Sequence, residues 1–263
     1  MKIGPLVAAI SAVAVLASCG GTPASPNDSG PVEVAPASPG ATGLPSKPTL
    51  HTYFDAVANA TVASYDQALK VAVPGSPAAG YVTYLRAAAQ AVLDSGQELE
   101  AANARAVVKD GGFGFCNGSG SSRACFRYTD ITGADGKVVD FSVNDKPVAG
   151  RVAVGSGTPV RLPAVEGSAT FVVAFESSGS DNLFVAARLR AGPLDLDTVS
   201  ATYRAPGGTP VESARMSGPS RVKAGTDGSY VFAFPQARIG GTLTLSVRDD
   251  AANLARTDLP VIR

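Results

Sequence analysis

The chain has 263 residues, of which 45% are hydrophobic and 17% are charged, and its 22 basic and 22 acidic side chains balance. This length allows one or two domains of ordinary size. A balanced charge gives no electrostatic reason for binding DNA, RNA or an anionic membrane face, so we expect no nucleic-acid partner.

Residues 1–18 have the pattern of an export signal. Lys2 precedes an apolar run of about 12 residues, which is too short to cross a hydrocarbon layer of roughly 30 Å. The run ends in Leu16-Ala17-Ser18-Cys19, which resembles the lipobox of bacterial lipoproteins. The resemblance implies cleavage before Cys19 and a diacylglycerol on its sulfur, while an ordinary secretory signal is the alternative. We therefore expect a lipid-anchored protein on the extracytoplasmic face of the cell membrane.

Residues 19–48 contain this cysteine and a tract rich in Pro, Gly and Ser. Such a composition cannot bury enough apolar surface to offset its ordering entropy, so we expect a disordered linker. A flexible linker of this length spans on the order of 30 Å, and a polyproline-like one reaches about 90 Å. Either form would hold the folded part away from the membrane.

From Thr49 to Ala72, apolar residues recur every three or four positions, which predicts one helix. Pro74-Gly75 interrupts the pattern. Ser76-Pro77 then provides an N-cap and a first-turn proline for a second helix, which we expect to continue towards Ala106. Many positions on the apolar stripes are Ala, so these helices can approach another element closely.

Strand patterns follow the helices. Cys116 and Cys125 flank a Gly/Ser-rich tip and, if Cys19 carries lipid, they are the only cysteines left. Two remaining cysteines in an exported chain favour a disulfide over free thiols or a metal site. We therefore expect a hairpin that is closed by a disulfide. With further strands predicted at 139–143 and 148–154, residues 49–154 predict an α+β domain whose helices cover one face of an antiparallel meander.

The stretches Leu50–Ala56 and Ser64–Ala68 resemble the opening of domains with the nuclear-transport-factor-2-like fold. That resemblance implies helices against a curved sheet that encloses a small-molecule pocket, while an unrelated helix-plus-meander domain is the alternative. The residues that we expect at such a pocket are Tyr53, Tyr81 and Tyr84. As helix residues they can equally belong to the core.

Residues 155–263 contain about seven short alternating segments separated by Gly and Pro turns, which predicts a β-sandwich. Asp227–Tyr230 and Leu243–Asn253 resemble the end of bacterial immunoglobulin-like domains, although Ala252 stands where many members have Gly. The resemblance implies two antiparallel sheets packed face to face. The chain has no Trp, so the Cys–Trp–Cys core of antibody domains is not expected.

No catalytic motif stands out. The single histidine, His51, lies at the start of the first predicted helix, where a solvent-facing or capping role is the ordinary explanation. The acidic pairs Asp195/Asp197 and Asp249/Asp250 fall in predicted turns, where solvation explains them without calcium binding or paired-carboxylate catalysis. We therefore predict no catalytic residue, no metal site and no cofactor.

These features favour a non-enzymatic binding or adaptor protein of the cell envelope, with an envelope protein as its partner. The alternative is a small-molecule carrier or enzyme that uses a deep, mostly apolar pocket between the helices and the sheet of the first domain. A structural spacer is a third hypothesis. A solid core between helices and sheet would argue against the pocket.

Overall fold

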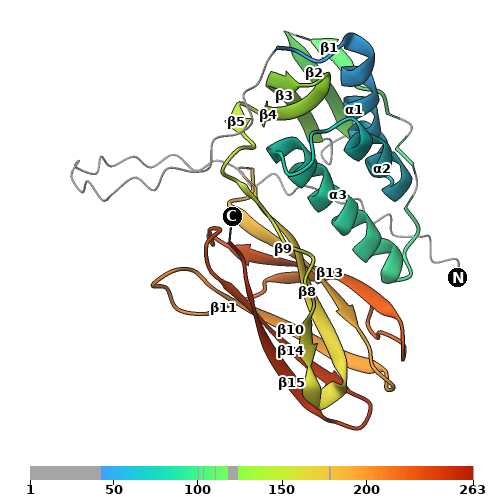
Figure 1. Ribbon diagram of the computed structural model, residues 1–263, viewed down its shortest axis with the longest axis vertical. Helices are drawn as coiled ribbons and strands as arrows, with labels where there is room; N and C mark the ends of the chain where they lie inside the picture. Colours follow the sequence, from blue (N-terminus) through green and yellow to red (C-terminus); the bar gives the residue numbers. More distant parts are fainter. Residues whose placement is uncertain are drawn as a thin grey trace, which may run out of the picture.

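The computed structural model describes residues 43–99, 101–102, 104–109, 111–117, 124–177 and 179–262. Over these residues the chain forms three α-helices and three antiparallel sheets. The helices lie against a five-stranded sheet, and two further sheets form a β-sandwich at the other end of the molecule (Figure 1). The predicted α+β chain with a β-sandwich is therefore confirmed.

The helices are α1 (Lys47–Asn59), α2 (Val62–Lys70) and α3 (Pro77–Asp94). The single helix predicted for residues 49–72 is wrong, because Ala60 adopts a left-handed conformation with φ 59° and Thr61 begins a new helix. The Thr61 hydroxyl accepts a hydrogen bond from the Ser64 N–H, and the Ser64 hydroxyl accepts one from the Thr61 N–H. This reciprocal capping box fixes the start of α2 even though the apolar period continues through it.

The predicted second helix begins at the expected place but ends at Asp94 instead of continuing towards Ala106. Gly96 has φ +81°, a left-handed backbone conformation that commonly ends a helix. The N–H of Ala102 then bonds to the carbonyl of Asn59 at 3.1 Å. The segment after α3 therefore lies beside α1 as extended chain.

The five-stranded sheet has the order β1-β2-β3-β4-β5. Its strands are β1 (Val107–Lys109), β2 (Gly112–Asn117), β3 (Ala124–Ala134), β4 (Lys137–Val143) and β5 (Lys146–Pro147). Cys116 of β2 lies directly opposite Cys125 of β3 and is bonded to it, with an S–S distance of 2.01 Å. The predicted disulfide hairpin is confirmed, while its tip lies outside the described residues.

The strand predicted for Val148–Val154 as part of the meander is wrong. Its last residues form β6 (Val152–Val154), which pairs with a strand of the sandwich. The Arg151 guanidinium fixes this crossing by donating hydrogen bonds to the carbonyls of Pro147 and Glu176, at 2.6 and 3.0 Å. The chain thus enters the sandwich before residue 155.

The sandwich combines one sheet in the order β12-β13-β9-β8-β6, with β7 also paired to β8, and one in the order β11-β10-β14-β15. The remaining elements are β7 (Val160–Leu162), the 3₁₀-helix η2 (Pro163–Val165), β8 (Gly167–Glu176), β9 (Asn182–Arg190), β10 (Leu196–Arg204), β11 (Val211–Glu212), β12 (Arg215–Ser217), β13 (Asp227–Pro235), β14 (Thr242–Asp249) and β15 (Leu254–Pro260). The core between the two sheets includes Leu183, Phe232, Phe234, Leu243 and Leu245.

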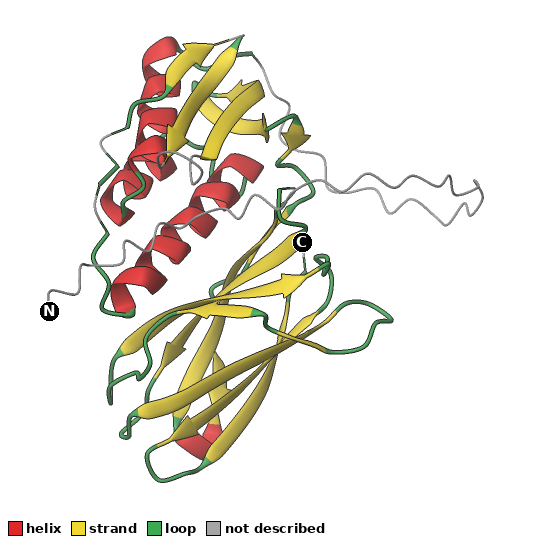
Figure 2. Ribbon diagram, turned by 180° about the vertical axis from the view of Figure 1, so that it is seen from behind, coloured by secondary structure: helices red, strands yellow, loops and turns green. Residues whose placement is uncertain are grey.

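Helix α3 packs across the outer face of the six-stranded sheet and so belongs to both halves of the fold (Figures 1 and 2). Its Ala91 is 0% exposed and packs with Val173 of β8, Ala186 of β9 and Val231 of β13. Small side chains on this side of α3 allow the close approach that the Ala-rich stripe predicted. The helix is therefore a shared layer between the first sheet and the sandwich.

Candidate functional site

Two of the three residues predicted at a pocket lie in a packed aromatic cluster between the helices and the first sheet. Tyr53 and Tyr81 are 0% and 4% exposed, and the rings of Phe54, Tyr128 and Phe141 surround them. The Tyr53 hydroxyl donates a hydrogen bond of 2.8 Å to a backbone carbonyl of α3. These rings pack against one another in the core between the helices and the first sheet.

Tyr84 lies where α3 meets the sandwich. Its ring stacks on Phe175 with a centroid distance of 5.0 Å and lies 5.7 Å from the ring of Phe184. Burial raises the pKa of Tyr53, Tyr81 and Tyr84 above the ordinary phenol value, so all three remain neutral near pH 7. The three tyrosines thus contribute packing surface and hydrogen bonds that hold the fold.

His51 is exposed on α1. Its Nδ1 atom lies 4.0 Å from a carboxylate oxygen of Asp55, and its ring meets Phe113 edge-on at 5.2 Å. Asp55 uses its other oxygen to accept a hydrogen bond of 2.8 Å from the Ala106 N–H. Asp55 therefore joins α1 to the chain that leads into β1, and His51 contacts β2.

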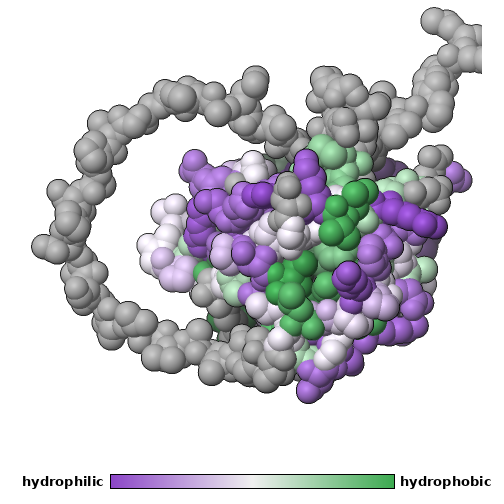
Figure 3. Space-filling view, turned by 90° about the horizontal axis from the view of Figure 1, so that it is seen from above, coloured by the Kyte–Doolittle hydropathy of each residue, from purple (hydrophilic) through white to green (hydrophobic). Residues whose placement is uncertain are grey.

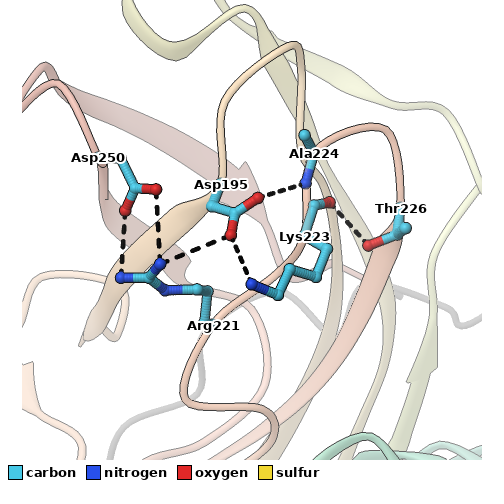
Figure 4. A network of polar contacts seen from close by, with 6 residues as sticks. All are labelled: Asp195, Arg221, Lys223, Ala224, Thr226 and Asp250. Carbon is cyan, nitrogen blue, oxygen red and sulfur yellow. Dashed lines mark hydrogen bonds and ion pairs between the residues drawn. The ribbon is translucent and has the colours of Figure 1, made fainter.

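One member of each acidic pair lies in a polar network at one end of the sandwich (Figure 4). The Arg221 guanidinium lies 3.6 Å from the Asp195 carboxylate and 3.2 Å from the Asp250 carboxylate. The Lys223 ammonium group donates to Asp195 at 2.9 Å, which lowers the pKa of that carboxyl and keeps it ionised. Two carboxylates thus face two cations, and the ion pairs between them connect three loops of the sandwich.

The other two acidic residues have separate surroundings. Asp249 is 2% exposed, and its carboxylate accepts hydrogen bonds of 2.9 Å from both the backbone N–H and the side-chain amide of Asn253. One buried carboxylate oxygen of Asp197 has no hydrogen-bond partner. In the part of the chain that the structure describes, no three His, Cys, Asp or Glu side chains gather in a way that could hold a metal ion.

The first of two candidate binding surfaces is the edge strand β1. Val107 and Val108 are 65% and 61% exposed, and among the described strands β1 pairs only with β2. Figure 3, which views the molecule from the β1 end, shows hydrophobic residues in the middle of this face with hydrophilic residues around them. Exposed apolar side chains on a free sheet edge are typical of surfaces that bind another chain.

The second candidate surface is the outer face of the four-stranded sheet. A hollow of about 350 Å³ lies there, lined by Arg204, Thr244, Arg256, Thr257 and Asp258. The Thr244 hydroxyl donates a hydrogen bond of 2.6 Å to Asp258. Within the described residues, Arg204 and Arg256 form no ion pair, and together with Asp258 they give this hollow two basic side chains and one acidic side chain.

Comparison with protein families, with curated proteins and with solved structures gives no match. None of the described helices combines the length and the apolar character needed to span a membrane. Cys19 lies outside the described residues, so its lipidation stays a prediction.

Both candidate surfaces were missed at the level of sequence. Strand β1 has only three residues, too few for an alternating pattern to be recognised. In β15, by contrast, the exposed Arg256 and Asp258 alternate with the more buried Ala255, Thr257 and Leu259. That alternation is a strand signal that could have been found.

Proposed function

We propose that this chain is a membrane-anchored, exported lipoprotein that acts as a non-enzymatic binding or adaptor protein of the cell envelope. The observation that carries this proposal is the exposed hydrophobic edge of β1, with Val107 and Val108 accessible to solvent. An extended segment of a partner protein can add to such an edge as a further strand. Main-chain hydrogen bonds then supply affinity, and the exposed side chains supply specificity.

The cysteines support an extracytoplasmic location. Disulfides persist in oxidising compartments, and Cys116 and Cys125 are joined in a hairpin of the first sheet. Cys19 is then the remaining cysteine, and it stands at the position that a lipobox requires. Two acyl chains on one cysteine suffice for stable membrane attachment, whereas a single chain is marginal.

We also infer that the sandwich is immunoglobulin-like. The strands β8-β9-β13-β12 on one sheet and β11-β10-β14-β15 on the other follow chain order in the way of strands A-B-E-D and C′-C-F-G of that fold. Many cell-surface domains use this architecture, but a fold alone does not specify a function. The strand order therefore supports an accessory envelope role only by analogy.

The proposal is tested by chemical crosslinking of the full-length protein in its native cells. Val108→Asp places a charge on the β1 edge and should abolish a crosslinked species that contains a second protein. Val211→Asp is the matched control, because Val211 also lies in a short edge strand and is 39% exposed. The proposed binding edge is wrong if Val108→Asp leaves the crosslinked species unchanged, or if the wild-type protein yields none.

A further inference from the structure

Strand β15 forms one edge of the four-stranded sheet. The register of β15 on β14 shows which backbone groups of β15 are hydrogen-bonded within the sheet. Hydrogen bonds of 2.9 and 3.1 Å run from the Val261 N–H to the Gly241 carbonyl and from the Asp249 N–H to the Asn253 carbonyl. Antiparallel strands exchange hydrogen bonds at every second residue pair. The odd-numbered residues of β15 therefore bond to β14, in the register that pairs Thr257 with Leu245.

The even-numbered residues of β15 direct their backbone groups away from the sheet. They are Leu254, Arg256, Asp258 and Pro260, and all four are exposed. Among the described residues, no backbone hydrogen bond from another element reaches these groups. The free edge thus carries a basic and an acidic side chain in alternation, and it ends in a proline that has no N–H.

We propose that two copies of this chain associate by antiparallel pairing of their β15 edges, with the two Thr257 residues facing each other across a two-fold axis. In this register Arg256 lies opposite Asp258 of the second copy, and Asp258 lies opposite Arg256 of the second copy. The two opposed residues exchange backbone hydrogen bonds, because both belong to the outward-facing set. Opposite charges at directly facing positions stabilise a strand pair.

The same register fixes the end pairs of the two strands. Leu254 lies opposite Pro260 of the second copy, so the Leu254 N–H meets the carbonyl of that proline. Pro260 has no N–H, so the Leu254 carbonyl of the second copy receives no hydrogen bond, and each end pair forms one hydrogen bond instead of two. Leu254 is 47% exposed in the single chain, and the facing proline ring would cover it. Pairing would therefore join two four-stranded sheets into one continuous sheet.

The charges also select this register over its neighbours. A shift of the two-fold axis by one residue in either direction places Arg256 opposite Arg256, or Asp258 opposite Asp258, of the second copy. Like charges directly opposite each other are destabilising. The Thr244 hydroxyl bonds to one carboxylate oxygen of Asp258, which leaves the other oxygen for the arginine of the second copy. Charged residues and proline on an edge can also serve to prevent pairing, in which case the chain is a monomer.

The experiment uses two differently tagged copies of the full chain, expressed together in cells and co-purified from detergent-solubilised membranes. Wild-type copies should co-purify. Arg256→Asp in both copies places Asp opposite Asp, and Asp258→Arg in both places Arg opposite Arg, so each variant should reduce co-purification by about tenfold or more. One Arg256→Asp copy expressed with one Asp258→Arg copy restores both opposite-charge pairs and should co-purify again.

Restored pairing also shows that both variants are folded. Arg248→Asp is the control, because Arg248 is exposed on the adjacent β14 away from the edge, and it should leave co-purification unchanged. Wild-type copies that do not co-purify, or a mixture of the two variants that fails to pair, would overturn the proposal. Val108→Asp should not affect this assay, so failure of the β1 proposal and failure of this one can be told apart.

Discussion

The carboxylate of Asp94, in the last turn of α3, accepts a hydrogen bond of 2.7 Å from the backbone N–H of Ser229 in β13. These residues are 135 positions apart in the sequence, and the bond joins the end of the helix to the six-stranded sheet. The other Asp94 oxygen accepts a hydrogen bond of 2.8 Å from the side chain of Gln90. Polar as well as apolar contacts thus hold α3 to the sandwich.

Removal of this carboxylate should destabilise the fold. Asp94→Ala leaves the partly buried Ser229 N–H without its partner, so the free energy of unfolding should fall by about 1–3 kcal/mol. Denaturant unfolding measures the change. Asp66→Ala is the control, because Asp66 forms a half-exposed ion pair with Arg86 and its loss should cost about 0–1 kcal/mol. Equal losses in the two variants would contradict a specific role for Asp94.

Enlarging Ala91 should weaken the packing of α3 against the sandwich. Ala91→Leu adds methyl groups where the side chain is 0% exposed, and overpacking of this kind costs about 1–3 kcal/mol. Since α3 packs on both the first sheet and the sandwich, the two halves of the wild-type chain should unfold together in one calorimetric transition. Ala63→Leu on the exposed side of α2 should have little effect. Two separate transitions in the wild-type chain would show that the halves are independent.

Much of the sandwich could be predicted from the sequence because its strands have one buried face. Leu183, Phe232 and Leu245 occupy alternate inward positions and are fully buried. The first sheet was recognised less completely. Its hairpin was found from the cysteine spacing. Strand β5 lies outside the predicted strands, and the strand predicted at 148–154 was placed in the meander because the pattern does not show that the chain changes sheets at Arg151.

The helical part shows where periodicity fails. The apolar period continues through Thr61 without a break. The helix boundary there is set by hydrogen bonds between Thr61 and Ser64, which the hydrophobic pattern does not reveal. The position of α3 was also unpredictable, because Ala side chains fit against many surfaces and do not identify one. Of the site residues, the disulfide could be predicted from residue counts, whereas the free edges depend on strand order in three dimensions.

The tyrosines predict how stability responds to alkaline pH. All seven tyrosines have a pKa raised above the ordinary 10.0, with burial as the largest cause for each. The neutral phenols make their full contribution to the free energy of unfolding below about pH 10. That contribution is lost as the pH rises above this value. Phenolate absorbance should therefore appear together with loss of the fold. Phenolate signal from a chain that is still folded at pH 10 would contradict the buried positions.

The disulfide should be present in the native protein and should stabilise it. Intact mass should be lower than that of the reduced chain by two hydrogen atoms, and Cys116 and Cys125 should resist alkylation without reduction. Replacing both by Ser should lower the free energy of unfolding by about 2–3 kcal/mol, the chain-entropy value for a closed loop of about ten residues. Two alkylatable thiols in exported protein would refute the bond.

Anchoring through Cys19 is the feature on which the proposed envelope role depends most. The most direct measurement fractionates cells that express either the wild-type chain or Cys19→Ala and determines the N-terminus by mass spectrometry. The wild-type protein should be found with the membranes and should begin at a Cys19 that carries diacylglycerol, whereas Cys19→Ala should be released from the membranes. A Cys19→Ala variant that stays with the membranes, or an unmodified Cys19 in the wild-type protein, would contradict the proposal.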